Sequence, residues 1–222
     1  VYFRHGFGTP YETLFFMFAG VCDGHCEWEA DQMTYTLFAK GQPINLHFGN
    51  GYFPMFCRPW LRNRVSIDHK YEVSERNQTG VAATAFMPAL EYLRASRTVD
   101  QIRALNSEYP LLNDKNAWAP EESKSWPGAP TNIETIPPVT WFRQVLFLKD
   151  DDPKGPNYFV IRDGFGSTPT RPTDVSFWFL ANSMTRQGAV FHFDGQCEVD
   201  MDVFVNTPEA FEPETGEYGH QQ

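Results

Sequence analysis

The sequence lacks the features that would mark a membrane-spanning or a nucleic-acid-binding protein. It contains no run of about 18 apolar residues, so no transmembrane helix is predicted. Basic residues are the minority, since 18 Lys and Arg stand against 28 Asp and Glu and give a formal net charge of −10. The field of such a chain repels nucleic acid and anionic membranes, although a local arginine cluster can still bind an anionic ligand. We therefore expect neither nucleic acid nor a membrane as a partner.

Signatures of several common enzyme classes are also absent. There is no GxSxG nucleophile elbow, no HExxH motif, no P-loop and no GxGxxG motif. The cysteines Cys22, Cys26, Cys57 and Cys197 do not form paired CxxC metal knuckles. Cys22 and Cys26 could form a disulfide in an oxidising compartment, but buried free thiols are the preferred interpretation. No initiator Met or signal peptide is present, and we expect the chain to be a fragment.

Aromatic residues are abundant instead, with 20 Phe, 9 Tyr and 6 Trp. Aromatic side chains favour β-strands, and their flat rings can stack on the apolar face of a sugar. Short apolar or alternating runs between Gly-, Pro- and Asn-rich turns recur in residues 1–75 and 139–206, among them TLFFMFAGV, MTYTLFAKG, VTWFRQVLFLKD and NYFVIRDGF. This pattern predicts a mostly β fold, an antiparallel multi-stranded β-sandwich.

Residues 76–138 separate these two strand-rich regions and have a different pattern. The segment ALEYLRASRTVDQIRALNSE predicts an amphipathic helix or two short ones, because its apolar residues recur at helical spacing. These apolar residues are Leu90, Leu93, Val99, Ile102 and Leu105. Residues 113–138, rich in Pro, Gly, Asn and Ser, predict a long surface excursion. We therefore expect one β-sandwich domain over residues 1–222 with a partly helical, partly irregular insertion at about 76–138.

The stretch DGHCEWEADQ, residues 23–32, gathers a histidine and four acids. His25, Glu27 and Glu29 alternate, so an extended backbone would place them on one face. A histidine with carboxylates suits a first-row metal ion, usually zinc. His25 could instead be a general acid or base, since the unperturbed pKa of histidine lies at about 6.5. A solvated turn between two strands is the simpler alternative, and the spacing alone favours it.

Two further motifs follow this stretch. His47 lies at the end of a predicted strand in NLHFGNG, and a lone strand histidine more often packs or forms a hydrogen bond than acts chemically. The segment CRPWLRNRV surrounds Trp60 with arginines and Asn63. Arginine presents a fork of donors that suits a carboxylate or a sulfate, and Trp can stack on a sugar ring. The alternative is a solvated edge with ion pairs to nearby acids.

Two polar residues of the later predicted strands, Asp163 and His192, are not expected to carry chemistry. Asp163 follows an apolar strand and precedes Gly164, so we expect it to cap a turn or to support other side chains rather than to act as a catalyst. His192 stands between two Phe residues, and we expect it to pack.

The order of these motifs is more specific than any one of them. GHCEWEADQ is followed by a strand ending in AKGQP, then by NLHFGNG, then by LRNRVSID, and later by a hairpin from RQVLF to YFVIRD. This ordered set resembles the C-terminal β-sheet domain of the heparinase II/III-like polysaccharide lyases. The likeness covers about residues 1–75 and 139–206, with 76–138 as the insertion.

The resemblance implies an enzyme that cleaves uronic-acid polysaccharides by β-elimination. In such enzymes the uronate carboxyl is neutralised, a base removes the C5 proton and the 4-linked group leaves. The family's active site lies between an N-terminal α/α toroid and the β-sandwich. We therefore expect a toroid upstream of Val1, an acidic polysaccharide as the substrate, a periplasmic or secreted location, and no lyase activity for this chain alone.

The resemblance also assigns residues to a site. Family members have a Gly-His cluster whose first His lies near the active site and whose second helps to bind a structural zinc ion. Here His25 holds the first position and Glu27 the second, while His47 stands where the family usually has Asp. Arg62 stands where the family has the His that precedes Asn63. The implied residues are His25, Arg62 and Asn63 for catalysis, Trp60, Arg64 and Tyr52 for substrate binding, and Glu27 and His47 for zinc.

Two alternatives remain open from the sequence. The first is a non-catalytic carbohydrate-binding β-sandwich, which the many aromatic residues and the Arg/Trp cluster would also fit. The second is a cupin-like metal enzyme, because GHCEWEADQMTYTLFAKG imitates the cupin order of His, acid and Gly, although HxH is absent. The particular polysaccharide is not specified by any of these motifs.

Overall fold

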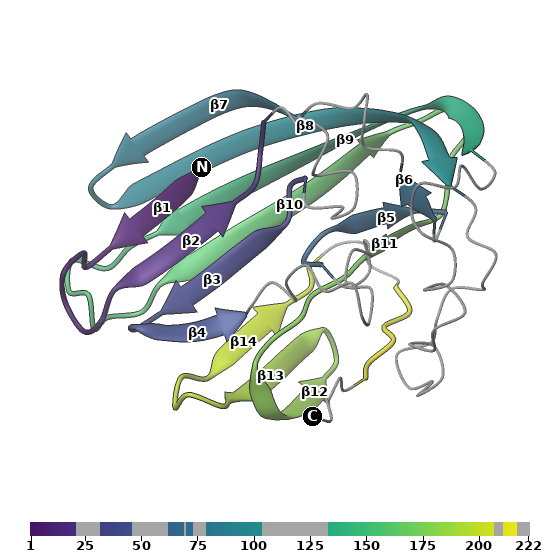
Figure 1. Cartoon of the computed structure of the whole chain (residues 1–222). Helices are drawn as coiled ribbons and strands as arrows, with labels where there is room; N and C mark the ends of the chain where they lie inside the picture. The colour runs from purple at the N-terminus through teal and green to yellow at the C-terminus, as the bar shows by residue number, and fades with distance from the viewer. Residues whose placement is uncertain are drawn as a thin grey trace, which may run out of the picture.

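The computed structural model confirms the mostly β fold. Every regular element among the residues that it describes is a β-strand, and all neighbouring strands in its sheets are antiparallel. The two largest sheets lie one on the other as two layers (Figure 1). The described residues are 1–20, 32–45, 62–68, 70–72, 79–103, 133–206 and 211–216.

The first layer is a four-stranded sheet with the order β1-β2-β3-β4. Its strands are β1 (Tyr2–His5), β2 (Thr13–Met17), β3 (Tyr35–Ala39) and β4 (Gln42–Asn45). Two residues, Lys40 and Gly41, join β3 to β4, and both have positive φ angles, of 55° and 74°. A two-residue hairpin loop with this geometry matches the twist of its strands, which explains the glycine. A Cβ atom at Gly41 would also overlap the carbonyl oxygen of Pro10.

The second layer is a five-stranded sheet built around two long strands. Its path runs β10-β9-β8-β6, and β7 also pairs with β8. The strands are β6 (Tyr71–Glu72), β7 (Gly80–Met87), β8 (Leu90–Arg103), β9 (Ile133–Leu148) and β10 (Tyr158–Gly166). The described part of the expected insertion therefore supplies central strands of this sheet, while residues 104–132 lie outside the description.

The helix prediction within this region is wrong, because Leu90–Arg103 is strand β8. Buried and less buried side chains alternate along it as a strand requires. A β-bulge between Val99 and Gln101 then shifts the alternation by one residue, so that Val99 and Ile102 are both buried at a spacing of three. This spacing imitates a helix in the sequence. On β9 the irregularity coincides with two prolines, which sheets tolerate at bulges.

The hydrophobic core lies between the two layers. Phe15 of β2 stacks on Phe159 of β10 with ring centroids 5.6 Å apart, and Phe3 of β1 meets Phe86 of β7 edge-on at 6.0 Å. The buried core includes Phe3, Phe15, Met17, Tyr35, Leu37, Leu93, Val99, Trp141, Val145 and Phe147. Aromatic and aliphatic side chains from both sheets therefore form the buried apolar core that stabilises the sandwich.

Two small sheets complete the described structure. Strands β5 (Val65–Ile67) and β11 (Thr173–Val175) form a pair. Strands β12 (Ala181–Gln187), β13 (Val190–Gly195) and β14 (Met201–Phe204) form a three-stranded sheet. This sheet lies near β4, because the amide of Leu180 donates to the carbonyl oxygen of Ile44 at 2.8 Å. No helix of the described residues is long and apolar enough to cross a membrane.

Candidate functional site

The predicted site residues divide into two groups. His25, Glu27, His47, Tyr52 and Trp60 lie outside the described residues. Arg62, Asn63 and Arg64 are described, and each is almost fully buried, with exposed fractions of 1%, 2% and 0%. The alternative of a solvated edge for these three residues is therefore wrong.

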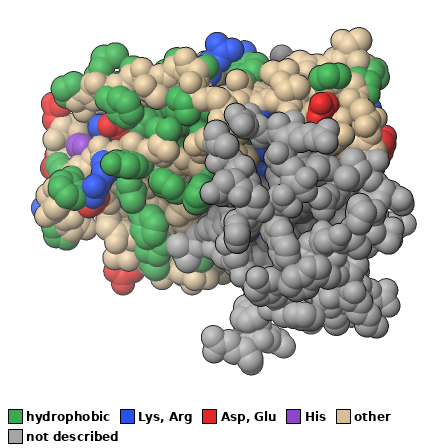
Figure 2. Space-filling view, turned by 45° about the horizontal axis from the view of Figure 1, so that its top comes forward, with side chains coloured by type: hydrophobic (Ala, Val, Ile, Leu, Met, Phe, Trp, Pro, Cys, Tyr) green, Lys and Arg blue, Asp and Glu red, His purple; other side chains and the backbone are tan. Residues whose placement is uncertain are grey.

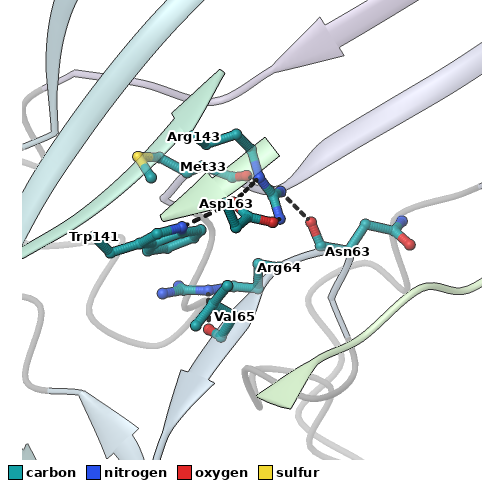
Figure 3. A network of polar contacts seen from close by, with 7 residues as sticks. All are labelled: Met33, Asn63, Arg64, Val65, Trp141, Arg143 and Asp163. Carbon is teal, nitrogen blue, oxygen red and sulfur yellow. Dashed lines mark hydrogen bonds and ion pairs between the residues drawn. The ribbon is translucent and has the colours of Figure 1, made fainter. Parts of the chain in front are cut away.

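Arg143, a residue that the sequence analysis did not single out, is the centre of the polar network around Asn63 and Arg64 (Figure 3). It points inward from β9 and is fully buried. Its Nε and Nη2 donate to the two carboxylate oxygens of Asp163, each at 2.8 Å. Its Nη1 donates to the backbone carbonyl oxygens of Met33 and Asn63, each at 2.7 Å. A bidentate pair with two further carbonyl acceptors fixes this guanidinium group in one orientation.

The hairpin of β9 and β10 explains how Arg143 meets its carboxylate. Arg143 and Asp163 are direct cross-strand partners in the antiparallel register. Trp141, two residues earlier on β9, faces the same side and donates its indole N–H to Asp163 at 2.9 Å. The Asp163 side chain is only 8% exposed. Asp163 is thus a supporting carboxylate, as expected, but it lies within a strand rather than capping a turn.

The side chain of Asn63 is also committed to backbone partners. Its Nδ2 donates to the carbonyl oxygen of Tyr35 at 3.2 Å, and its Oδ1 accepts the amide of Trp178 at 2.6 Å. Asn63 therefore joins β3 to the segment that follows β11. Because both ends of its amide group are used and buried, Asn63 positions the backbone rather than presenting a free polar group.

Buried arginines gather around this centre. Arg62, Arg64, Arg97 and Arg143 are each at most 2% exposed. The guanidinium carbon atoms of Arg64 and Arg143 lie 5.1 and 5.3 Å from the ring centroid of Trp141, a cation–π arrangement. Arg64 Nε donates to the carbonyl oxygen of Val65 at 3.1 Å. In a chain with a net charge of −10, these residues concentrate positive charge in the interior.

Tyr35 lies beside this cluster, with the Arg143 guanidinium carbon atom 5.6 Å from its ring centroid. Burial raises the pKa of Tyr35 far above its usual value, and the nearby Asp163 charge acts in the same direction, while Arg143 opposes both. The phenol is therefore neutral at physiological pH and is unsuited to act as a base there.

The Arg143 network joins two residues that follow predicted motif segments. A single Arg143 nitrogen binds the carbonyl oxygens of Met33, just after residues 21–31, and of Asn63, just after residues 46–61. On the other flank of residues 21–31, the amide of Thr79 donates to the carbonyl oxygen of Gly20 at 3.2 Å. Met33 and Asn63, which follow the segments that hold His25 and Trp60, are therefore joined by the same buried guanidinium group.

The zinc prediction is not tested by the described residues. Within them no group of three His, Cys, Asp or Glu side chains could hold a metal ion, and the two predicted ligands lie outside them. Cys197, half-buried, is a free thiol, while the other three cysteines are outside the description.

The prediction that His192 packs between aromatic residues is wrong. Its ring is exposed, and Nδ1 lies 2.7 Å from the Asp202 carboxylate on the neighbouring strand β14. The hydrogen bond to Asp202 raises the pKa of His192, desolvation opposes it, and the charges of Asp202, Asp200 and Asp194 act in the raising direction.

The alternation of residues along its strand could have identified Arg143 from the sequence. In VTWFRQVLF the arginine occupies an inward position, because it alternates with Trp141 and Val145, which are apolar. A charged residue at an inward strand position needs a partner, and the facing strand offers an acid in VIRDG. The alternation of both strands therefore identifies the pair once the hairpin is assumed.

Comparisons with protein-family models, with curated proteins and with solved structures gave no match. The fold and the network define the chain structurally as an antiparallel β-sandwich with an arginine-centred polar network in its interior. Membership of the heparinase II/III-like lyases stays a prediction.

Proposed function

We propose that the chain is the β-sheet part of a carbon–oxygen lyase that cleaves uronic-acid polysaccharides by β-elimination, in a periplasmic or secreted setting. The ordered motifs of the sequence and the β-sandwich fold support this function. The observation that carries it is the convergence at Arg143, because one buried group binds the backbone at Met33 and at Asn63, each two residues after a segment that holds proposed site residues.

The described residues would serve this reaction by positioning. Arg143, held by Asp163, fixes the backbone at Met33 and Asn63, and a misplaced catalytic group can cost a large factor in rate. Asn63 adds two hydrogen bonds to the same backbone. In this proposal His25 is the group that transfers a proton, while Tyr52 and Trp60 contact the sugar. Arg62 and Arg64 belong to the buried arginine cluster.

The test uses the protein encoded by the complete reading frame and three acidic polysaccharides, namely polygalacturonate, alginate and heparin. Elimination leaves an unsaturated uronate that absorbs in the ultraviolet. His25→Ala should lower turnover by about 100-fold or more, the usual scale for a general acid or base. His192→Ala is the matched control, since His192 is exposed on β13 and should leave turnover unchanged. Equal turnover of the wild type and His25→Ala would remove His25 from the reaction.

Zinc enters this proposal through Glu27 and His47. Metal analysis of the purified protein should find about one zinc ion per chain, and Glu27→Gln or His47→Ala should lower that content. A wild-type protein purified without chelators and without stoichiometric zinc would contradict the metal assignment and leave the elimination chemistry untouched.

A non-catalytic carbohydrate-binding sandwich is the second candidate, and the exposed aromatic side chains favour it. Hydrophobic side chains form broad patches on the described surface, with scattered charged groups between them (Figure 2). Large exposed aromatic residues are Tyr2, Phe7, Tyr11, Phe18, Phe86, Tyr158, Phe165, Phe177 and Phe204. Binding of acidic glycans by the protein of the complete reading frame, without any release of unsaturated uronate, would favour this candidate over the lyase.

A further inference from the structure

The outward side of the five-stranded sheet carries a second group of arginine and aromatic side chains, separate from the buried cluster. Strand pairing places Arg94, Gln144 and Arg162 in one row across β8, β9 and β10. The adjacent row consists of Ser96, Phe142 and Gly164. These positions alternate with buried residues on β8 and β9, so they face away from the sandwich core.

Phe142 is the platform of this group. Its ring lies directly over the backbone of Gly164 on β10, where a Cβ atom would overlap the ring. A glycine within a strand commonly permits such a close approach. The guanidinium carbon atoms of Arg94 and Arg162 lie 5.2 and 5.9 Å from the ring centroid, one from each neighbouring strand. We name these three residues the Arg94–Phe142–Arg162 clamp.

Gln144 links one arginine of the clamp to a neighbouring tyrosine. Gln144 donates from Nε2 to the Tyr92 hydroxyl at 2.6 Å, and its Oε1 accepts from Arg162 Nη1 at 3.4 Å. Both arginines are exposed. Among the described residues neither forms an ion pair, so their charges stay available to a ligand.

The charge of this face is opposite to that of the chain. We consider the stretch of β8 from Leu90 to Thr98 and the residues of β9 and β10 that lie alongside it. Its outward positions include Arg94 and Arg162 but no Asp or Glu. Within this stretch the acids are Glu91 and Asp163, which alternate to the inward side, where each has a cationic partner; Asp100 and Glu134 lie beyond it, toward the other end of β8 and β9. An acid-free cationic row on a chain of net charge −10 favours an anionic partner locally.

We infer that the Arg94–Phe142–Arg162 clamp binds an anionic sugar residue of a polysaccharide, at a site distinct from the Arg143 network. The ring offers an apolar platform for a pyranose, and each guanidinium offers a fork of donors for a carboxylate or a sulfate. A purely apolar partner would bury two unpaired guanidinium groups, which is costly. The inference takes the class of polymer from the proposed function, but not its active site.

The experiment measures binding of polygalacturonate to the 222-residue chain by titration calorimetry, with dextran as the neutral comparison. Replacing both arginines, as R94Q with R162Q, should weaken polygalacturonate binding about tenfold or more, since two charged contacts are lost. Dextran should bind weakly to every variant. Arg186→Gln is the matched control, because Arg186 is an exposed arginine that lies 5.3 Å from the Phe191 ring on another sheet, and binding should be unchanged.

Circular dichroism and the thermal midpoint establish that each variant is folded, which exposed substitutions should preserve. Equal polygalacturonate affinity for the double variant and the wild type would overturn the inference. So would dextran binding as tight as polygalacturonate binding, tighter binding of single-stranded DNA, or self-association of the chain that disappears in the double variant.

The lyase assay separates this inference from the proposed function. If the double variant loses polygalacturonate affinity and the complete protein releases no unsaturated uronate, the clamp stands and the lyase proposal fails. If unsaturated uronate is released but binding to this chain does not depend on Arg94 and Arg162, the lyase proposal stands and the clamp fails.

Discussion

The two faces of strand β9 use arginine and aromatic side chains in opposite ways. On the inner face Arg143 is fully buried, and its three guanidinium nitrogens donate four hydrogen bonds to a carboxylate and two backbone carbonyl groups. On the outer face, next along the chain, Phe142 is contacted by Arg94 and Arg162, which remain exposed. The same residue types therefore fix the backbone on one side and present charge on the other.

This contrast follows from the strand period of two and from the cost of burial. A buried guanidinium must have its partners within the fold, because an unpaired charge in the interior is strongly destabilising. An exposed guanidinium stays hydrated and needs no partner until a ligand displaces the water. The number and type of partners thus distinguish an arginine that stabilises the fold from one that is available for binding.

Asp163→Ala should produce the largest loss of stability. It removes the carboxylate that pairs with Arg143 and also accepts the Trp141 indole N–H, so a buried charge is left uncompensated. Breaking one partner of a buried pair costs about 3–5 kcal/mol. Urea denaturation followed by circular dichroism measures this change in the free energy of unfolding.

Glu134→Ala is the control for Asp163→Ala, since Glu134 lies on the same strand as Arg143 and forms an exposed ion pair with Lys70 at 2.8 Å. That pair should contribute little, because exposed ion pairs are screened by solvent. Asp163→Asn, which keeps two acceptor lone pairs, should lose less than Asp163→Ala. Similar losses for Glu134→Ala and Asp163→Ala would break the distinction between a buried and an exposed ion pair.

Asn63→Ala should give the next largest loss, of about 2–3 kcal/mol in the free energy of unfolding. The substitution leaves the buried Tyr35 carbonyl and the Trp178 amide without their side-chain partner. Asn182→Ala on β12 is the matched control, because the exposed Asn182 forms only a long hydrogen bond of 3.4 Å to Gly195. Denaturation curves of equal midpoint for the two variants would contradict the anchoring role of Asn63.

Much of the fold follows from the sequence, and its main error has a local cause. The runs around Phe15, Leu37 and Val145 alternate with period two and are strands. Leu90–Arg103 was expected to be helical because a β-bulge changes the spacing of Val99 and Ile102. A bulge depends on the facing strand, here β9 with its two prolines, and a single segment does not display that partner.

The candidate site was harder to predict from the sequence than the fold, because the burial of a side chain depends on tertiary packing. Arg62, Asn63 and Arg64 looked like a surface patch, since three polar residues in succession are typical of a solvated segment. In the structure these residues are buried, and the partners of Asn63 come from distant parts of the chain, namely Tyr35, Arg143 and Trp178. The sequence motifs therefore singled out these residues but did not predict that they are buried.

Gly164→Ala tests the outer face of the sheet, where the Phe142 ring lies over Gly164. The added Cβ would overlap the Phe142 ring, so the ring must move away from the β10 backbone and its position relative to the two arginines must change. We expect a loss of about 1–2 kcal/mol in the free energy of unfolding, typical of overpacking at a site that can partly relax. Polygalacturonate affinity should fall as well. Gly166→Ala is the control, since nothing lies within 4 Å of a Cβ atom there.

The smallest effect is expected at the pair of His192 and Asp202 on the three-stranded sheet, which is an exposed pair, unlike that of Arg143 and Asp163. The hydrogen bond to Asp202 raises the pKa of His192 in the folded chain, so the folded state holds the proton more tightly than the unfolded state. The stabilisation is therefore complete below the ordinary pKa of histidine and disappears as pH rises through the folded value.

Asp202→Asn should move the His192 pKa, followed by NMR, back toward its ordinary value. The thermal midpoint should scarcely change, because both side chains are about half exposed. A His192 pKa that is the same in both proteins would show that the raised value comes from the neighbouring acids rather than from this pair.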